Sequence, residues 1–425
     1  MRTMFYSVFL SFAALLLALT GNVFAEQAPT RLKVYIGGQQ RPDLMRELFA
    51  SYMAANPGVK IDLEIGGATS DLHQKYLNMV LTAKDTTLDV FLIDVVRPAQ
   101  FAAAGWAEPL NVYFGSNTAL EAAMGQYLPA YREANTINGK IIALPAFADS
   151  MFLYYRKDLL KKYGFQPPTT WPELANMART ISAGEHNANL QGLSFQGKAI
   201  EGTVCTFLLP YWSLGGEMLR DGKLTFDAPK AEAGLAMWRG MVNQGVAKKN
   251  VAEVGTDDTR KEFQAGRVIF AVNWGYAWNH FELGADTQVA NKVGVAKLPA
   301  MDGGKSVSCM GGWNWAVSAF SKNKAASAAL IRWLSSPEIS KQLAIRGSFH
   351  PVFASVYEDP DVTKAIPWFA DALPVVLTAR PRPVTPMYKM VSDALRINTN
   401  TVMAGVKKPS EALAEIELRV GRAVR

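Results

Sequence analysis

The stretch RLKVYIGGQQRPDLMRELFASYMAANPGVKIDLEIGG, residues 31–67, decides the fold of this chain. Its first eight residues read as a β-branched strand that ends in glycines. Apolar side chains then recur at helical spacing until Asn56-Pro57-Gly58 stops the helix. VKIDLEIGG, residues 59–67, reads as a second strand, so the stretch predicts one strand–helix–strand unit.

The alternation continues beyond residue 67. LHQKYLNMVLTA (72–83) predicts a second helix, and LDVFLIDV (88–95) is an almost fully apolar strand of the kind buried in parallel sheets. This order of elements places the chain in the α/β class. Two further strands, 139–147 and 151–160, are expected to flank a loop at Ala148–Ser150. A capping box, Thr170 with Glu173, predicts a helix that stops before Gly184.

Length and composition bound the kind of protein. A chain of 425 residues is too long for one ordinary core, so two domains are expected. Hydrophobic residues at 49% and charged residues at 19% describe a well-packed globular protein. The formal charge of +7 is spread along the chain without clusters of Lys, Arg and aromatic residues, which argues against a nucleic-acid groove.

The amino terminus carries the parts of a cleavable secretory signal. Arg2 precedes the apolar run FYSVFLSFAALLLALT (5–20), and Val23 and Ala25 stand before Glu26. A membrane anchor is the alternative, but the run is shorter than the ~20 residues that a spanning helix needs. The cleavage site has no cysteine after it, which argues against a lipid anchor. We therefore expect residues 1–25 to be removed and a soluble, exported protein to remain.

Cysteine and histidine usage offers little for metal chemistry. In an oxidising compartment Cys205 and Cys309 could form a disulfide, but the sequence leaves open whether they meet. The four histidines (73, 186, 280 and 350) lie far apart and form no HExxH pattern. We expect no metal site and no cofactor.

The segment MGGWNWAVSAF, residues 310–320, sets two tryptophans after a double glycine. If it is a strand, the period of two puts Trp313 and Trp315 on one face. From the residues alone, the segment is either a core strand or an aromatic platform for a flat ligand.

Several long segments share a pattern with one known family. The segments are LDVFLIDVVRPAQFAAAGWAEPL (88–110), FQAGRVIFAVNWGYAW (263–278), RPRPVTPMY (380–388), residues 143–174 and residues 293–338. Together they resemble the sugar-binding components of bacterial ABC importers, extracellular solute-binding protein family 1. The resemblance is closest to the trehalose/maltose-binding branch. It implies a two-lobed, maltose-binding-protein-like fold (type II) with three interlobe crossings. It divides the chain into a lobe I of 26–146 and 310–346 and a lobe II of 147–309 and 347–425.

The resemblance also implies a sugar site. Aromatic faces suit the apolar C–H patches of a hexose, and carboxylate, guanidinium and amide groups suit its hydroxyls. The matching positions are Trp274, Tyr276, Trp313, Asp94, Asp149 and Arg382, with Phe147 and Gly312 at the cleft wall. Where the branch has a glutamate, this chain has Gln39 and Gln40. Trp315 is expected in the core.

Each polar or aromatic candidate keeps a structural alternative. Asp94 could cap a helix, and Asp149 could form an Asx-turn. Trp274 could pack in the core with Trp278, and Arg382 could form a surface salt bridge.

We expect a binding protein without catalytic residues. In the periplasm, as the resemblance implies, it would capture an α-linked disaccharide, trehalose or maltose, by hinge closure. As a monomer it would deliver the sugar to an inner-membrane ABC permease and its ATPase. The same fold could instead bind glucosylglycerol, sucrose or a longer glucan. An exported glycoside hydrolase, with Asp94 and Asp149 as paired carboxylates, is the alternative from another class.

Overall fold

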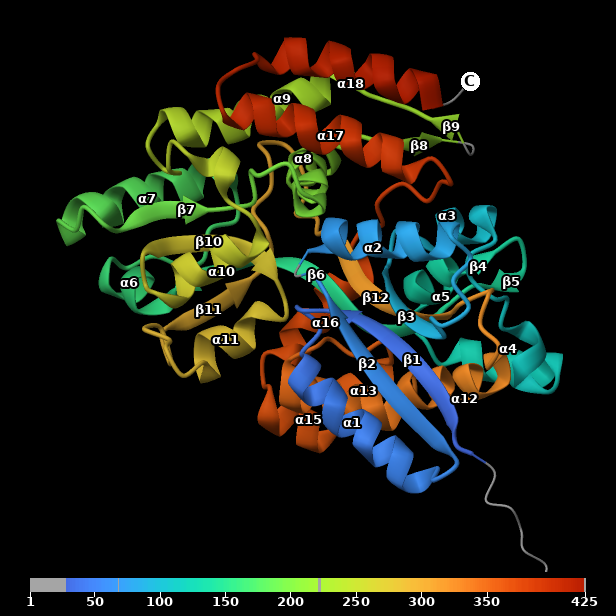
Figure 1. The fold of residues 1–425 in the computed structure, drawn as a ribbon. Coiled ribbons are helices and arrows are strands. Elements are labelled where there is room, and N and C mark those ends of the chain that lie inside the picture. Colours follow the sequence, from blue (N-terminus) through green and yellow to red (C-terminus); the bar gives the residue numbers. More distant parts are fainter. Residues whose placement is uncertain (1–27, 68, 221–222, 424–425) are drawn as a thin grey trace, which may run out of the picture.

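The computed structural model describes residues 28–67, 69–220 and 223–423 (Figure 1). The predicted signal peptide, residues 1–25, lies outside these ranges. Across the described ranges, no helix is both long enough and apolar enough to cross a bilayer.

A mixed sheet runs through both lobes in the strand order β2-β1-β3-β12-β6-β10-β7, and β11 pairs with β6. The strands are β1 (Thr30–Gly37), β2 (Val59–Gly66), β3 (Val90–Asp94), β6 (Leu144–Arg156), β7 (Gln191–Ser194), β10 (Val268–Trp274), β11 (Val293–Ala296) and β12 (Met310–Val317). Two small hairpins join β4 (Thr136–Ile137) to β5 (Lys140–Ile141) and β8 (Leu219–Arg220) to β9 (Lys223–Leu224).

The predicted strand–helix–strand unit is confirmed at the first edge of this sheet. β1 pairs in parallel with β2 over its whole length and with β3 at Val34 and Tyr35. Helices α1 (Pro42–Ala55) and α2 (Ser70–Thr82) form the crossovers. Leu48 of α1 joins the core cluster that holds Val34, whereas Leu77 of α2 joins the cluster that holds Tyr35. Successive strand residues face opposite ways, so the two helices cover opposite faces of the sheet.

β6 connects the two lobes, and here the sequence prediction was wrong. Two strands around a loop at Ala148–Ser150 were expected, but β6 is one strand of 13 residues. Its first half pairs with β12 as far as Ser150, and its second half pairs with β10 from Met151 onward. The backbone of the expected loop therefore lies within the sheet, because Met310, Gly311 and Gly312 of β12 pair with Ser150, Asp149 and Ala148.

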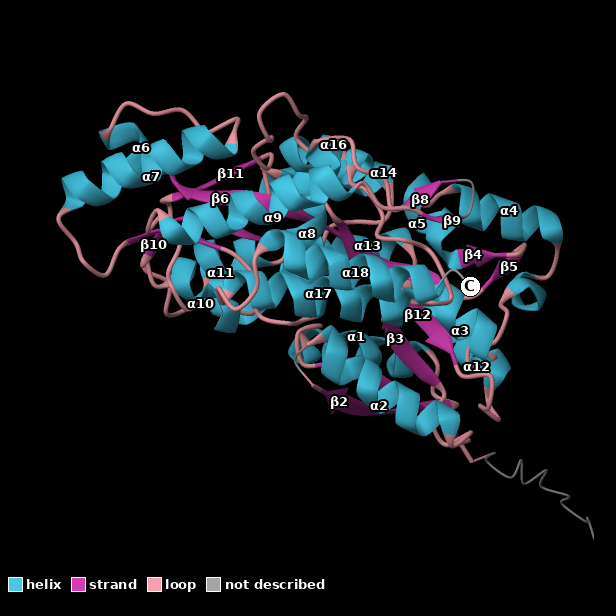
Figure 2. Cartoon of the chain, turned by 90° about the horizontal axis from the view of Figure 1, so that it is seen from above, coloured by secondary structure: helices cyan, strands magenta, loops and turns pink. Residues whose placement is uncertain are grey.

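Helices complete the two lobes. In Figure 1, α8 (Glu201–Ser213), α9 (Ala228–Asn243), α17 (Tyr388–Met403) and α18 (Pro409–Ala423) lie together at the top, and α1 and α12 (Lys324–Leu334) lie below. In the 90° view of Figure 2 the same four helices again lie side by side. Around the first lobe run α3 (Pro98–Ala104), η1 (Asn111–Phe114), α4 (Asn117–Gly125) and α5 (Pro129–Asn135). The remaining elements are α6 (Lys157–Lys162), α7 (Trp171–Glu185), η2 (Val251–Glu253), α10 (Thr256–Gln264), α11 (Ala277–Leu283), α13 (Pro337–Gly347), α14 (Ala354–Tyr357), α15 (Pro360–Ala365) and α16 (Phe369–Thr378).

The predicted capping box at the start of α7 is confirmed. The Thr170 hydroxyl accepts from the Glu173 backbone N–H at 3.3 Å, and the Glu173 carboxylate accepts from the Thr170 backbone N–H at 3.3 Å. The predicted end was too early, because the helix continues through Gly184 to Glu185. His186 then ends it in the left-handed conformation, with φ 49°.

Cys205 of α8 and Cys309, the residue before β12, form a disulfide with an S–S distance of 2.00 Å and a Cα–Cα distance of 5.8 Å. Both residues are fully buried. The bridge ties α8 to the start of the strand that carries Trp313.

Candidate functional site

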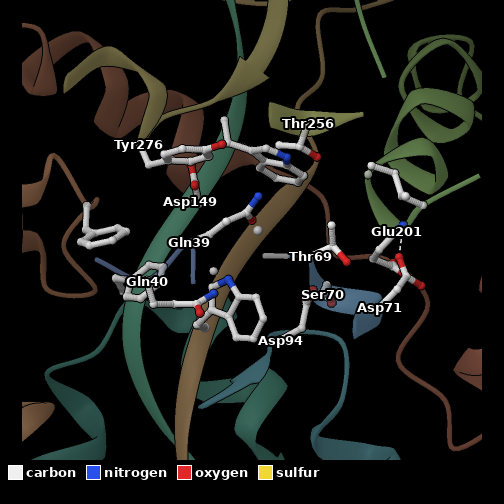
Figure 3. A pocket seen from close by; sticks show the side chains of 18 of the residues that line it. Gln39, Gln40, Thr69, Ser70, Asp71, Asp94, Asp149, Glu201, Thr256 and Tyr276 are labelled. Atoms are coloured by element: carbon white, nitrogen blue, oxygen red, sulfur yellow. Dashed lines mark hydrogen bonds between the residues drawn. The ribbon is translucent and has the colours of Figure 1, made fainter. Parts of the chain in front are cut away.

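One pocket between the lobes brings together all ten residues proposed from the sequence. Figure 3 shows this pocket and labels Gln39, Gln40, Asp94, Asp149 and Tyr276 among them. It encloses about 720 Å³ of space that no atom fills, its open mouth included. The ten are Gln39, Gln40, Asp94, Phe147, Asp149, Trp274, Tyr276, Gly312, Trp313 and Arg382. Nine lining residues had not been proposed: Thr69, Ser70, Asp71, Ile200, Glu201, Gly202, Thr256, Gly311 and Phe349.

Strand pairing assembles the centre of the pocket. Trp313 of β12 stands opposite Asp94, the last residue of β3, and opposite Phe147 of β6. Phe147 stacks on Phe349 with ring centroids 4.2 Å apart. An acid at the carboxyl end of a buried strand lies where ligands gather in open α/β sheets.

The two tryptophans of β12 have different environments. Trp315 is fully buried and packs against Phe49 of α1, with ring centroids 6.4 Å apart. Trp313 stays partly exposed in the pocket, with its ring edge-on to His73 of α2 at 5.1 Å. The pairing with β6 shifts register between Trp313 and Asn314, at the point where the two environments separate.

The double glycine before Trp313 lets the pocket wall form. A Cβ on Gly311 would stand 2.4 Å from the Trp274 ring, so only glycine leaves room for that indole. Gly312 has φ +126°, and a Cβ there would stand 2.5 Å from the carbonyl oxygen of Phe147. Trp274 therefore lies against β12 and lines the pocket. Trp278 packs against Trp368 instead, with ring centroids 6.1 Å apart.

Arg382 is buried at the base of the pocket, not on the surface as one alternative held. Only 3% of it is exposed. Its Nη1 donates to Oε1 of Glu201 at 2.8 Å, and its Nη2 donates to Oδ1 of Asp94 at 3.2 Å and to the carbonyl of Met310 at 3.4 Å. Asp94 also accepts from the Ser70 hydroxyl at 2.7 Å. These contacts join two carboxylates and one guanidinium in a single desolvated group.

Asp149 has a different kind of support. Its Oδ1 accepts from the backbone N–H of Gly275 and of Ser150, both at 2.7 Å. No cationic side chain within the described ranges pairs with it. Burial raises the pKa of Asp149 to about 7, although these backbone donors act in the opposite direction. Nearby, the Tyr276 hydroxyl is buried without a hydrogen-bond partner in the described part of the chain.

Gln40 is only 3% exposed, and its Oε1 is another buried oxygen without a partner among the described residues. The Nδ1 of His73 is likewise buried without a hydrogen-bond partner among the described residues. A Cβ built on Gly37 would stand 2.3 Å from that oxygen and 3.2 Å from that nitrogen, so both atoms crowd one small space. Burial lowers the pKa of His73 to about 4, and its Nε2 bonds the carbonyl of Leu92 at 2.6 Å. The ring is thus neutral, with Nδ1 as an acceptor.

The comparisons with known proteins agree with this architecture. The family model described as a bacterial extracellular solute-binding protein matches residues 38–341. A probable ABC transporter-binding protein of Deinococcus radiodurans is 38% identical over 361 residues, which cover 83% of this chain and 84% of that protein.

Solved structures give the same picture. Maltose-bound MalE3 of T. maritima is 31% identical, with a TM-score of 0.86 over 93% of this chain and all of that one. A solute-binding protein of Agrobacterium vitis with bound D-mannitol shares the fold at 22% identity and a TM-score of 0.80, over 93% of this chain and 98% of its own. The fold is therefore the two-lobed, MalE-like α/β fold, and the chain belongs to the bacterial extracellular solute-binding proteins of ABC transporters.

Proposed function

We propose that this protein captures an α-linked disaccharide, trehalose or maltose, in the pocket between its lobes. The observation that carries the proposal is the pairing of aromatic faces from two sides of one pocket. Trp313 stands on β12, and Trp274 and Tyr276 stand at the end of β10 and just after it. The 31%-identical neighbour in which maltose is bound supports this class of ligand.

The polar lining suits the hydroxyls of a sugar. Asp94, Asp149 and the amides of Gln39 and Gln40 offer acceptors and donors around the aromatic faces. Each hexose hydroxyl can donate and accept one hydrogen bond at the same time, so fixed carboxylates and amides can each hold one or two of them. The aromatic faces then cover the apolar C–H patches of the rings.

Binding alone is the proposed task. Contacts from both lobes form together only when the lobes close, so the ligand stabilises the closed form by its higher affinity for that form. The closed protein would then deliver the sugar to a membrane permease. The hydrolase alternative is disfavoured because Asp94 is already engaged by Arg382 and Ser70, and the related proteins are binders.

Calorimetric titration against a panel of sugars tests the proposal. The panel contains trehalose, maltose, sucrose, glucosylglycerol, maltotriose and mannitol, and we expect the tightest binding for trehalose or maltose. Trp313→Ala should lose at least about 1.5 kcal/mol of that affinity. Trp278→Ala, which removes an indole outside the pocket, is the matched control and should keep it. Tightest binding of mannitol, or release of glucose during incubation, would contradict the proposal.

A further inference from the structure

Helix α8 lacks a cap from its own segment. It begins at Glu201, and the N-cap residue Ile200 has no side chain that can accept a hydrogen bond. The carboxylate of Asp71 takes this role: its Oδ2 accepts from the backbone N–H of Glu201 at 3.0 Å, as the dashed line in Figure 3 shows. Asp71 lies in the first turn of α2, 130 residues earlier in the chain and beside the first part of the sheet.

A second contact joins the same carboxylate to α17. The Nη1 of Arg396 lies 3.3 Å from Oδ1 of Asp71, and the two side chains are 20% and 27% exposed. One carboxylate on α2 thus holds two helices of the upper group, each through a different oxygen.

A residue of α8 also contacts a side chain that follows β3. The Glu201 carboxylate, at the start of α8, lies 3.8 Å from the guanidinium of Arg97, which follows β3. Together the two contacts connect α2 and the end of β3 with α8, and Asp71 and Glu201 line the pocket. They can exist only while these elements stay together.

From this geometry we propose that Asp71 is a positioning residue for ligand capture, an N-cap that one lobe supplies to a helix of the other and that stabilises the closed form. A carboxylate at a helix N-terminus satisfies a free N–H and interacts favourably with the helix dipole. Because the N–H of Glu201 loses this partner on opening, the stabilisation belongs to the closed form alone and shifts the equilibrium between forms. Sugar affinity then depends on Asp71 even if the sugar never touches it; this last step rests on the proposed function.

Interlobe distances measured without sugar test the first part. The two native cysteines are bridged, so spin labels can be placed at Met79→Cys on α2 and Val406→Cys after α17, where the native side chains are 63% and 74% exposed. Double electron–electron resonance should show a population at the short distance of the closed form. Asp71→Ala and Arg396→Met should both move population to longer distances. Asp393→Ala is the matched control: it removes the other acidic partner of Arg396, on the same helix, and should cause no such lengthening.

Ligand kinetics test the second part. In the variants Asp71→Ala and Arg396→Met we expect the dissociation rate of the tightest-binding sugar to rise, by about tenfold for Asp71→Ala, with little change in the association rate. An affinity loss in Asp71→Ala alone, with unchanged distances in both variants, would overturn the proposal and make Asp71 a plain sugar contact. If no disaccharide binds, the proposed function fails, while the sugar-free distances still decide on the cap.

Discussion

Replacing Arg382 should destabilise the fold far more than an ordinary ion-pair deletion. The guanidinium is 3% exposed and lies between the carboxylates of Asp94 and Glu201, at 3.2 and 2.8 Å. Arg382→Met keeps most of the apolar stem but leaves two buried carboxylates without their main cation. Breaking a buried pair by removing one partner typically costs about 3–5 kcal/mol. We expect a loss of that size in the free energy of unfolding.

Urea unfolding at pH 7, followed by tryptophan fluorescence, measures this loss. Arg31→Met is the matched control, because Arg31 pairs with Asp62 at a similar distance of 3.3 Å but both side chains are largely exposed. An exposed pair is worth about 0–1 kcal/mol, so the control should change little. If Arg382→Met lost no more stability than Arg31→Met, the view of Arg382 as a desolvated centre of charge would be refuted.

Three further outcomes follow from the packing and the charges. Trp315→Ala should lose about 3–5 kcal/mol of unfolding free energy in thermal or urea melts, whereas Trp313→Ala should lose mainly sugar affinity; equal stability losses would contradict their assignments. Burial raises the folded-state pKa of Asp149 to about 7, so the folded protein should lose stability as the pH rises from about 4 to 7. Asp149→Asn has no carboxyl to ionise, so its gain in stability over the native protein should grow across that range in melts at successive pH values. Replacing Cys205 and Cys309 with alanine opens a loop of 104 residues and should cost about 2–5 kcal/mol in the same melts; an unchanged midpoint would contradict this.

The sequence predicted the parts of the fold that depend on local patterns. The spacing of apolar residues located β1, α1, β2 and α2, and the chemistry of Thr170 and Glu173 located the start of α7. β6 was misread because Asp149 and Ser150 are polar residues that usually mark a loop. What keeps them extended is the pairing with β12, more than 150 residues away, which no local pattern reveals.

In the site, too, residues that match a sequence pattern were predicted, and residues that act through distant contacts were not. The positions that matched a family pattern were all found in one pocket. Asp71 and Glu201 were missed because each is an ordinary acid in the first turn of a helix. Their role arises from the approach of α2 to α8. No local pattern marked the start of α8 at Glu201, so the missing side-chain cap at Ile200 becomes visible only in the structure.

The distribution of charge in the pocket bears on the kind of ligand. Four acids line it, but Asp94 and Glu201 share Arg382, Glu201 also lies 3.8 Å from the guanidinium of Arg97, and Asp71 is paired with Arg396. The protein's own cations therefore occupy these three carboxylates, and the fourth, Asp149, is held by backbone N–H groups and has a raised pKa.

Such a pocket has little net charge left for a ligand to neutralise. An anionic ligand would meet carboxylates, and a cationic ligand would have to compete with guanidinium groups already in place. The groups that remain available are the amides of Gln39 and Gln40, the spare lone pairs of the fixed acids and the aromatic faces of Trp274 and Trp313. Uncharged hydroxyls on a ring with apolar faces would use all three, so this distribution of charge favours the proposed neutral sugar over a charged solute of the same size.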